Sequence, residues 1–265
     1  MGGTTAIAVE RSGPVLRLTL NRPEARNAMS LAMVAELTSA LAEAEQDGTT
    51  RVVVLRGAGG GFCAGADIKD MAAARGRLSE DPDAVAKVNA SFGVLCNAYA
   101  ASPLAIVAAV HGAVMGGGFG LACVADVVIA ADDTVFRLPE TSLGVLPAQI
   151  APYLVERLGY SEAKRLAVTG SRIDAREALA IRLVHEVCAV EGLEAVVERV
   201  TRDILHCAPG ALAATKALVR KARLTPAADL IDEAARAFSR AALGPEGVDG
   251  TMAFIQKRKP GWVPQ

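Results

Sequence analysis

The chain is poor in aromatic residues and histidine, and it has no run of charge of one sign. Aromatic side chains make up 4% of the 265 residues, and only three histidines are present. The formal net charge is -1 with both signs interspersed, so neither a nucleic-acid-binding surface nor a charged tail is indicated. His111, His185 and His206 share no ligand spacing, and we expect no metal site.

Long apolar runs and paired cysteines are also missing. No uninterrupted apolar stretch reaches the length of a membrane span, and no basic segment followed by an apolar one opens the chain. The five cysteines are odd in number, widely spaced and set among apolar residues, which is typical of buried thiols in a reducing compartment. We therefore expect a cytoplasmic protein that does not use the membrane.

The hydrophobic share of 52% is enough for a substantial core. Apolar periodicity predicts strands at 5–10, 14–20, 52–55, 104–110, 127–131, 135–138 and 186–189. It predicts helices at 31–46, 83–102, 150–158, 161–169, 174–182, 191–206, 209–222, 227–243 and 245–256, and residues 71–82 should form a mobile loop. The loose repetition of strand, strand and helix indicates an α/β coil of ββα turns, although a plain doubly wound sheet fits nearly as well.

Three consecutive glycines, 116–118, stand between an apolar strand and an apolar helix. Bare backbone N–H groups at the positive end of a helix suit a developing oxyanion. A second glycine-rich passage, residues 57–71, also follows a strand, and Asp67 falls near the start of the next helix. The alternative for both passages is a tight turn or close helix packing.

Together these passages resemble the crotonase, or enoyl-CoA hydratase/isomerase, superfamily. The resemblance covers essentially the whole chain, and five segments in the family's order carry it: NRPEARNAMS, GFCAGADIKDM, AVHGAVMGGGFGLACVADVVIA, LPETSLGVLPA and AFIQKRKPGW. It implies a spiral of ββα turns over residues 1–200 that binds acyl-CoA and carries catalysis. It also implies an α-helical trimerisation region over 201–265, and assembly as a trimer or as a hexamer built from two trimers.

The resemblance also implies that two backbone N–H groups, of Ala66 and Gly117, bind the thioester oxygen of an acyl-CoA. Glu140, in the LPETSLG segment, would be the catalytic acid or base, since apolar neighbours disfavour its charged form. Ordinary hydratases of the family carry a further glutamate two residues after the glycine run, where this chain has Gly120. A single acid is compatible with hydration, with double-bond isomerisation, or with a variant reaction such as thioester hydrolysis or decarboxylation.

We favour a lyase that hydrates an enoyl-CoA. Gly120 and the P-A-x-I-x-P run at 147–152 are similar to the bacterial branch that hydrates 3-methylglutaconyl-CoA or isohexenylglutaconyl-CoA in leucine and acyclic terpene breakdown. Such a substrate carries a second carboxylate, for which Arg137 is a candidate partner. The alternative for Arg137 is that it pairs with an acid at the surface of the protein. A relative that binds CoA thioesters or RNA without turnover remains the alternative from another class, and the balanced charge counts against RNA.

Coenzyme A is part of the substrate, so no separate cofactor is expected. By resemblance, Arg26 would approach the CoA phosphates, and the end of the second glycine passage would line the adenine pocket. Phe254 and Lys257 would close the site, often from a neighbouring subunit; a plain basic tail is the alternative for them. The expected CoA-binding residues are Arg26, Ala64, Asp67, Ile68, Lys69, Phe254 and Lys257.

Overall fold

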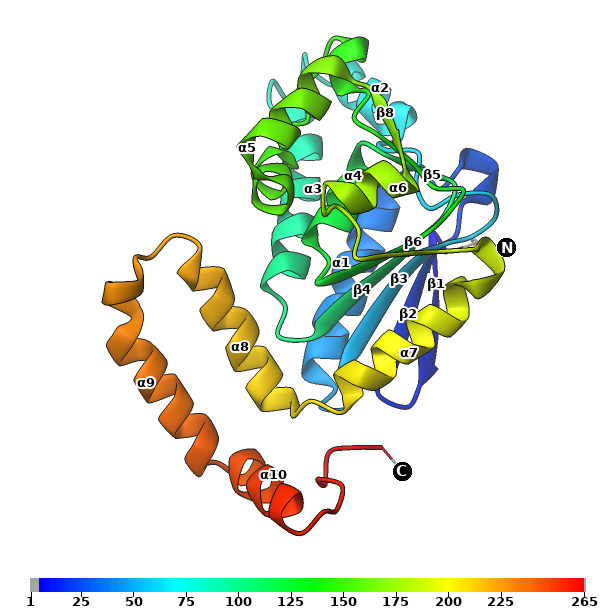
Figure 1. The fold of residues 1–265 in the computed structure, drawn as a ribbon. Coiled ribbons are helices and arrows are strands. Elements are labelled where there is room, and N and C mark those ends of the chain that lie inside the picture. The colour runs from blue at the N-terminus through cyan, green and yellow to red at the C-terminus, as the bar shows by residue number, and fades with distance from the viewer. Residues whose placement is uncertain (1–4, 265) are drawn as a thin grey trace.

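A twisted six-stranded sheet forms the centre of the computed structural model, which describes residues 5–264 (Figure 1). Its order is β1-β2-β3-β4-β6-β9. The strands are β1 (Ile7–Ser12), β2 (Val15–Leu20), β3 (Val52–Gly57), β4 (Ala105–Val110), β6 (Val127–Ala131) and β9 (Glu186–Cys188). The first two form an antiparallel hairpin and every later pair is parallel, as connections through helices require.

A second, three-stranded sheet consists of β5 (Ala113–Met115), β7 (Val135–Arg137) and β8 (Arg172–Asp174). The chain passes from β4 into β5 at Gly112, whose φ of +54° suits glycine. A Cβ there would lie 2.4 Å from the carbonyl oxygen of Gly60, so this turn admits no other residue without a shift. Strands in two sheets followed by a helix make the predicted spiral of ββα turns, and the fold class is confirmed.

Helices cover both faces of the larger sheet. One core contains Val53 and Leu55 of β3, and the other contains Val52 and Val54, as alternation along a buried strand requires. The first core is closed by helices α1 (Leu31–Gln46), α3 (Ala84–Ala101), α4 (Gly117–Val124), α5 (Ala151–Thr169) and α6 (Ala175–Ala180). The second is closed by α7 (Leu193–Leu205), and the predicted boundary at residue 200 falls within this helix.

The last three helices form an arm that extends away from the sheet (Figure 1). They are α8 (Pro209–Ala222), α9 (Ala227–Leu243) and α10 (Pro245–Ile255). Arg51, at the start of β3, holds the base of the arm: its guanidinium donates to the carbonyl oxygens of Leu205 at 3.1 Å and Trp262 at 2.6 Å. Large apolar side chains stay exposed on the arm, including Phe238 at 76% and Leu243 at 79%.

The predicted helices match the structure closely, with two exceptions. Residues 71–82 do not form only a loop, because α2 (Ile68–Gly76) continues through the first half of that range. The two helices predicted at 150–158 and 161–169 are merged in α5, which kinks at Gly159 (φ 72°). Within residues 5–264, no helix combines the length and the apolar character that crossing a bilayer requires.

Asn27 joins the first connecting loop to the second glycine passage. Its side chain is fully buried, and its amide donates to the carbonyl oxygens of Ala58 and Gly61, both at 2.8 Å. The side-chain oxygen accepts from the N–H of Arg22 at 2.9 Å. The φ of Asn27 is +54°, a left-handed conformation that asparagine tolerates better than most residues.

We expect Asn27→Ala to lower the free energy of unfolding by about 2–4 kcal/mol, because it leaves buried backbone groups unpaired and places alanine in the left-handed region. The matched control is Asn97→Ala, since Asn97 is exposed and its side chain makes one hydrogen bond within residues 5–264, from Arg220 at 3.2 Å. The control should change stability by less than about 0.5 kcal/mol. Denaturant unfolding of both variants measures the difference, and equal losses would contradict a special role for Asn27.

Candidate active site

The two glycine-rich passages lie against each other. The N–H of Cys63 donates to the carbonyl oxygen of Ala113 and the N–H of Met115 donates to that of Cys63, both at 2.9 Å, which pairs the second glycine passage with β5. A Cβ built on Gly116 would lie 3.6 Å from the Cα of Gly65. Two loops that are about 50 residues apart in the sequence therefore meet at the start of α4.

The three glycines at this point have different roles. Gly116 has a φ of +50°, and a Cβ on it would lie 2.9 Å from Oε1 of Glu140. A Cβ on Gly118 would lie 2.6 Å from the Cβ of Cys63, so close packing requires glycine there. On Gly117 a Cβ would make only ordinary contacts, at 3.4 Å from Phe92 and 3.6 Å from Met29. Backbone conformation and packing therefore require glycine at positions 116 and 118. At position 117 the fold itself would admit a side chain, so a glycine there is consistent with a ligand that approaches its backbone.

Two backbone N–H groups at this meeting point have no protein acceptor in the described part of the chain. Gly117 is the first residue of α4, where a helix offers its N–H no internal partner. Ala66 lies opposite Met29 in a short β-bridge. The hydrogen bonds of this bridge join Met29 to Gly65 and to Asp67, not to Ala66 itself. Neither the Ala66 nor the Gly117 N–H donates a hydrogen bond within residues 5–264. Both remain available to an oxygen that carries negative charge.

Glu140 is a carboxylate that contacts the glycine turn, residues 116–118. It follows Pro139 and opens a short 3-10 helix, Glu140–Leu143, between β7 and α5. Its Oε1 faces Gly116, while its Oε2 is buried and has no hydrogen-bond partner within residues 5–264. Burial raises the pKa of this carboxyl above its ordinary value. A carboxylate kept buried and unpaired costs stability, which is typical of a group retained for chemistry.

Gly120 is enclosed by apolar side chains. A Cβ on this residue would lie 2.3 Å from Cγ2 of Ile150 and 3.4 Å from Cε1 of Phe92. Ile150 is 3% exposed. Sequence reasoning did not identify Phe92, which stands in no recognisable motif, and it noted Met29 and Ile150 only as parts of the NRPEARNAMS segment and the 147–152 run. Their proximity to the glycine turn becomes visible only in three dimensions.

The expected CoA-binding residues of the first half lie together beside the glycine turn. The carbonyl oxygen of Arg26 accepts from the N–H of Ala64 at 3.0 Å, and the Arg26 side chain is exposed. Ile68 is 80% exposed, and Lys69 also faces solvent. Asp67 differs, because its carboxylate accepts from the Lys69 N–H at 2.9 Å and pairs with Arg22.

Phe254 and Lys257 lie elsewhere. Phe254, in α10, is 86% exposed, and Lys257 follows that helix with a φ of +52°. Figure 1 places α10 at the opposite end of the molecule from α2 and β5, which flank the glycine turn. A single chain therefore does not bring these two residues to Glu140. Any contact between them and the site would have to come from another subunit.

Arg137 is held by the protein itself. Its Nε donates to the carbonyl oxygen of Gly170 at 2.9 Å, and its Nη2 lies 3.4 Å from the hydroxyl of Ser142. The guanidinium thus connects the segment after β7 to the end of α5. This arrangement favours a structural role over the alternative of a substrate contact.

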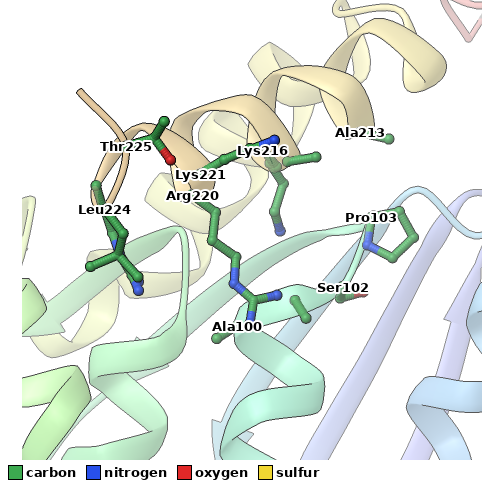
Figure 2. Close-up of a pocket in the computed structure, with 12 residues that line it drawn as sticks. Ala100, Ser102, Pro103, Ala213, Lys216, Arg220, Lys221, Leu224 and Thr225 are labelled. Carbon is green, nitrogen blue, oxygen red and sulfur yellow. The ribbon is translucent and has the colours of Figure 1, made fainter. Parts of the chain in front are cut away.

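A separate groove of about 520 Å³ lies between α8 and the end of α3 (Figure 2). Lys216, Arg220, Lys221 and Arg223 line it. Protein groups already bind these cations: Asp126 is 2.5 Å from Lys216, Asn97 is 3.2 Å from Arg220, and Glu233 and Glu156 pair with the other two. The groove also contains no histidine, cysteine or acid that could move a proton. The glycine turn with Glu140 is therefore the better candidate.

Comparison with known proteins identifies the family of the chain. Residues 10–265 match the family model described as enoyl-CoA hydratase/isomerase. The solved structure of Pseudomonas aeruginosa AtuE is 52% identical, with a TM-score of 0.94 over 98% of this chain and 100% of that one.

Two further relatives span nearly the whole chain. An enoyl-CoA hydratase/isomerase structure from Marinobacter aquaeolei is 48% identical, with a TM-score of 0.93 over 98% of this chain and 99% of that one. A probable enoyl-CoA hydratase of Mycobacterium bovis is 34% identical over 96% of both chains. The chain belongs to the enoyl-CoA hydratase/isomerase family.

Proposed function

We propose that this protein adds water across the α,β double bond of an enoyl-CoA thioester. The N–H groups of Ala66 and Gly117 would bind the thioester oxygen, and Glu140 would handle both the water and the proton at the α-carbon. Hydration passes through an enolate whose negative charge lies on the thioester oxygen. Hydrogen bonds from two backbone N–H groups would stabilise that charge.

One observation carries the proposal: the half-buried carboxylate of Glu140, whose Oε2 has no hydrogen-bond partner within residues 5–264, contacts the same glycine turn whose Gly117 N–H has no acceptor there. A proton acceptor with a raised pKa and an oxyanion-binding amide are the two parts that enolate chemistry needs. A relative that only bound CoA thioesters or RNA would gain nothing from the cost of this carboxylate.

Double-bond isomerisation is the second candidate, because one carboxylate can also move a proton between two carbons. The two reactions differ in product: hydration removes the enoyl-thioester absorbance, whereas isomerisation yields a shifted double bond. A branched glutaconyl-type acyl group is the finer proposal, based on Gly120 and the 147–152 run. Arg137 is held at Gly170, so the second carboxylate of such a substrate would need another donor.

We further propose that the protein works as a trimer or hexamer in the cytosol. The arm exposes apolar side chains that a partner subunit would cover, and Phe254 and Lys257 could then close a neighbour's CoA site. Arg26, Ala64, Ile68 and Lys69 would bind CoA within one chain, Asp67 through its backbone. The cysteines Cys63, Cys96 and Cys123 are free and buried, which fits a reducing compartment.

We expect Glu140→Gln to lower kcat by about 10²- to 10⁴-fold, because the amide cannot accept a proton. The assay is hydration of crotonyl-, 3-methylglutaconyl- and isohexenylglutaconyl-CoA, with the products identified. Glu43→Gln, which changes an exposed acid on α1, is the matched control and should keep full activity. Unchanged turnover of every active substrate by Glu140→Gln would end the proposal.

The raised pKa of Glu140 predicts opposite pH effects on activity and on stability. As pH falls through that pKa, which lies above the ordinary 4.5, kcat/KM should fall with the ionised fraction. Stability runs the other way, because a carboxyl with a raised folded-state pKa stabilises the fold below its unfolded pKa and loses that contribution as pH rises. Glu140→Gln should therefore raise the thermal midpoint relative to the native chain near neutral pH, with the gain vanishing near pH 4. A gain that is independent of pH would argue against a buried charge.

Gly117→Ala and Gly118→Ala should separate catalysis from folding. Alanine fits sterically at 117, so stability should change by less than about 1 kcal/mol. A methyl group beside the amide would displace the thioester oxygen and lower kcat/KM by about 10- to 100-fold. At 118 the new Cβ would overlap Cys63, costing about 1–3 kcal/mol of stability. Enzyme kinetics and denaturant unfolding on both variants test this, and full activity in Gly117→Ala would count against an anion site.

A further inference from the structure

Both the Glu140 carboxylate and an apolar wall, formed by Ile150 and Phe92, lie against one face of α4. The N–H of Gly120 donates to the carbonyl oxygen of Gly116 at 3.0 Å, so the two residues are stacked one helical turn apart. Glu140 lies against the first of these glycines and Ile150 against the second. Phe92 contacts both successive turns of α4, since its ring edge lies 3.4 Å from the Cβ positions of both Gly117 and Gly120.

Ile150 cannot readily move away from this wall. It precedes α5, its carbonyl oxygen accepts the N–H of Leu154 at 2.9 Å, and it is 3% exposed within the main core. The group nearest the Cβ position of residue 120 is a methyl on its branched Cβ, and that Cβ itself would be 3.3 Å away. A β-branched side chain has few rotamers to retreat into. Position 120 therefore has no room for any side chain while Ile150 is in place.

We infer that Ile150 is a specificity-determining residue that sets the depth of the acyl site beside Gly120. An acyl group whose thioester oxygen is bound at Gly117 extends along this face of α4, and Ile150 with Phe92 limits the size of the substituent on its β-carbon. The wall is apolar, so of the two substituents on a branched β-carbon it would face the alkyl group and not the one that carries a carboxylate. The inference rests on the proposed function, because it assigns the acyl chain to the same glycine turn.

The test compares two enoyl-CoAs that differ at the β-carbon: crotonyl-CoA, with a methyl group, and 4-methyl-2-pentenoyl-CoA, with an isopropyl group. Ile150→Ala should raise the kcat/KM of the larger substrate relative to crotonyl-CoA by at least about 10-fold, the usual effect of alkyl-sized changes in an apolar pocket. Ile150→Val should give a smaller shift in the same direction. The matched control is Leu154→Ala, which lies one helical turn after Ile150 and is 1% exposed, but whose side chain is not among the atoms nearest the Cβ position of residue 120.

Binding provides a readout that does not depend on turnover. The ratio of dissociation constants for 4-methylpentanoyl-CoA and butanoyl-CoA, both saturated, should shift toward the larger ligand in Ile150→Ala and stay constant in Leu154→Ala. If the native chain hydrates nothing, the proposed function fails, while this ratio still decides the role of Ile150. Equal behaviour of the two alanine variants in both the kinetic and the binding ratio would overturn the inference.

The steric basis has its own test in a double-mutant cycle. Gly120→Ala should lower the thermal midpoint by several degrees in the native chain, because the new methyl overlaps Cγ2 of Ile150. In the Ile150→Ala background the same change should cost little, since the obstructing methyl is gone. Additive losses would show that Ile150 does not close this space.

Discussion

The absence of a side chain at Gly116 is the constraint on which the rest of the site depends. At that residue the left-handed backbone, the loop carrying Gly65 and the carboxylate of Glu140 all come within a few ångströms of one Cα. Any Cβ would displace one of the three. The spiral of ββα turns makes this arrangement possible, because it brings the loop after β3 and the loop after β5 together at Gly116.

Glu140 shows how the fold supports an unfavourable group. A carboxylate oxygen buried without a partner opposes folding, so it needs a scaffold with stability to spare. The two cores that enclose β3 and β4 provide it, with strands buried on both faces. Hydrogen bonds at Asn27 and Arg137 fix the loops on either side, so the site is held by residues that do not themselves contact the carboxylate.

Much of the fold could be predicted from the sequence, because long amphipathic helices and fully apolar strands carry strong periodic signals. α8 and α9 begin and end at the predicted residues. The three-residue strands β5 and β8 were not predicted, although β7 and β9 of the same length were. In sequence β5 follows β4 after only two residues, and β8 contains two charged residues around a single isoleucine, so neither stands out as a separate apolar strand. The loop predicted at 71–82 was wrong in its first half, because Asp67 caps a helix there and Ala74 is buried.

The residues of the candidate site likewise fall into those that the sequence could predict and those that it could not. The glycine run and Glu140 stand in recognisable segments, whereas Phe92 belongs to an ordinary helix and reaches the glycine turn only through packing. Nothing in the sequence could show that Gly120 faces Ile150, because thirty residues separate them and no motif joins them. What sequence reasoning left out was therefore the set of apolar side chains that give the site its shape.

Arg51 joins the two ends of the arm. The chain leaves the body at Leu205 and comes back at Trp262, and both carbonyl oxygens bind the same guanidinium. Helices α8 to α10 therefore leave and rejoin the body beside the same side chain, and the ion pair of Lys216 with Asp126 adds a second attachment along α8. A force applied to the arm by a neighbouring subunit would be passed to the first residues of β3, the strand that leads directly into the second glycine passage.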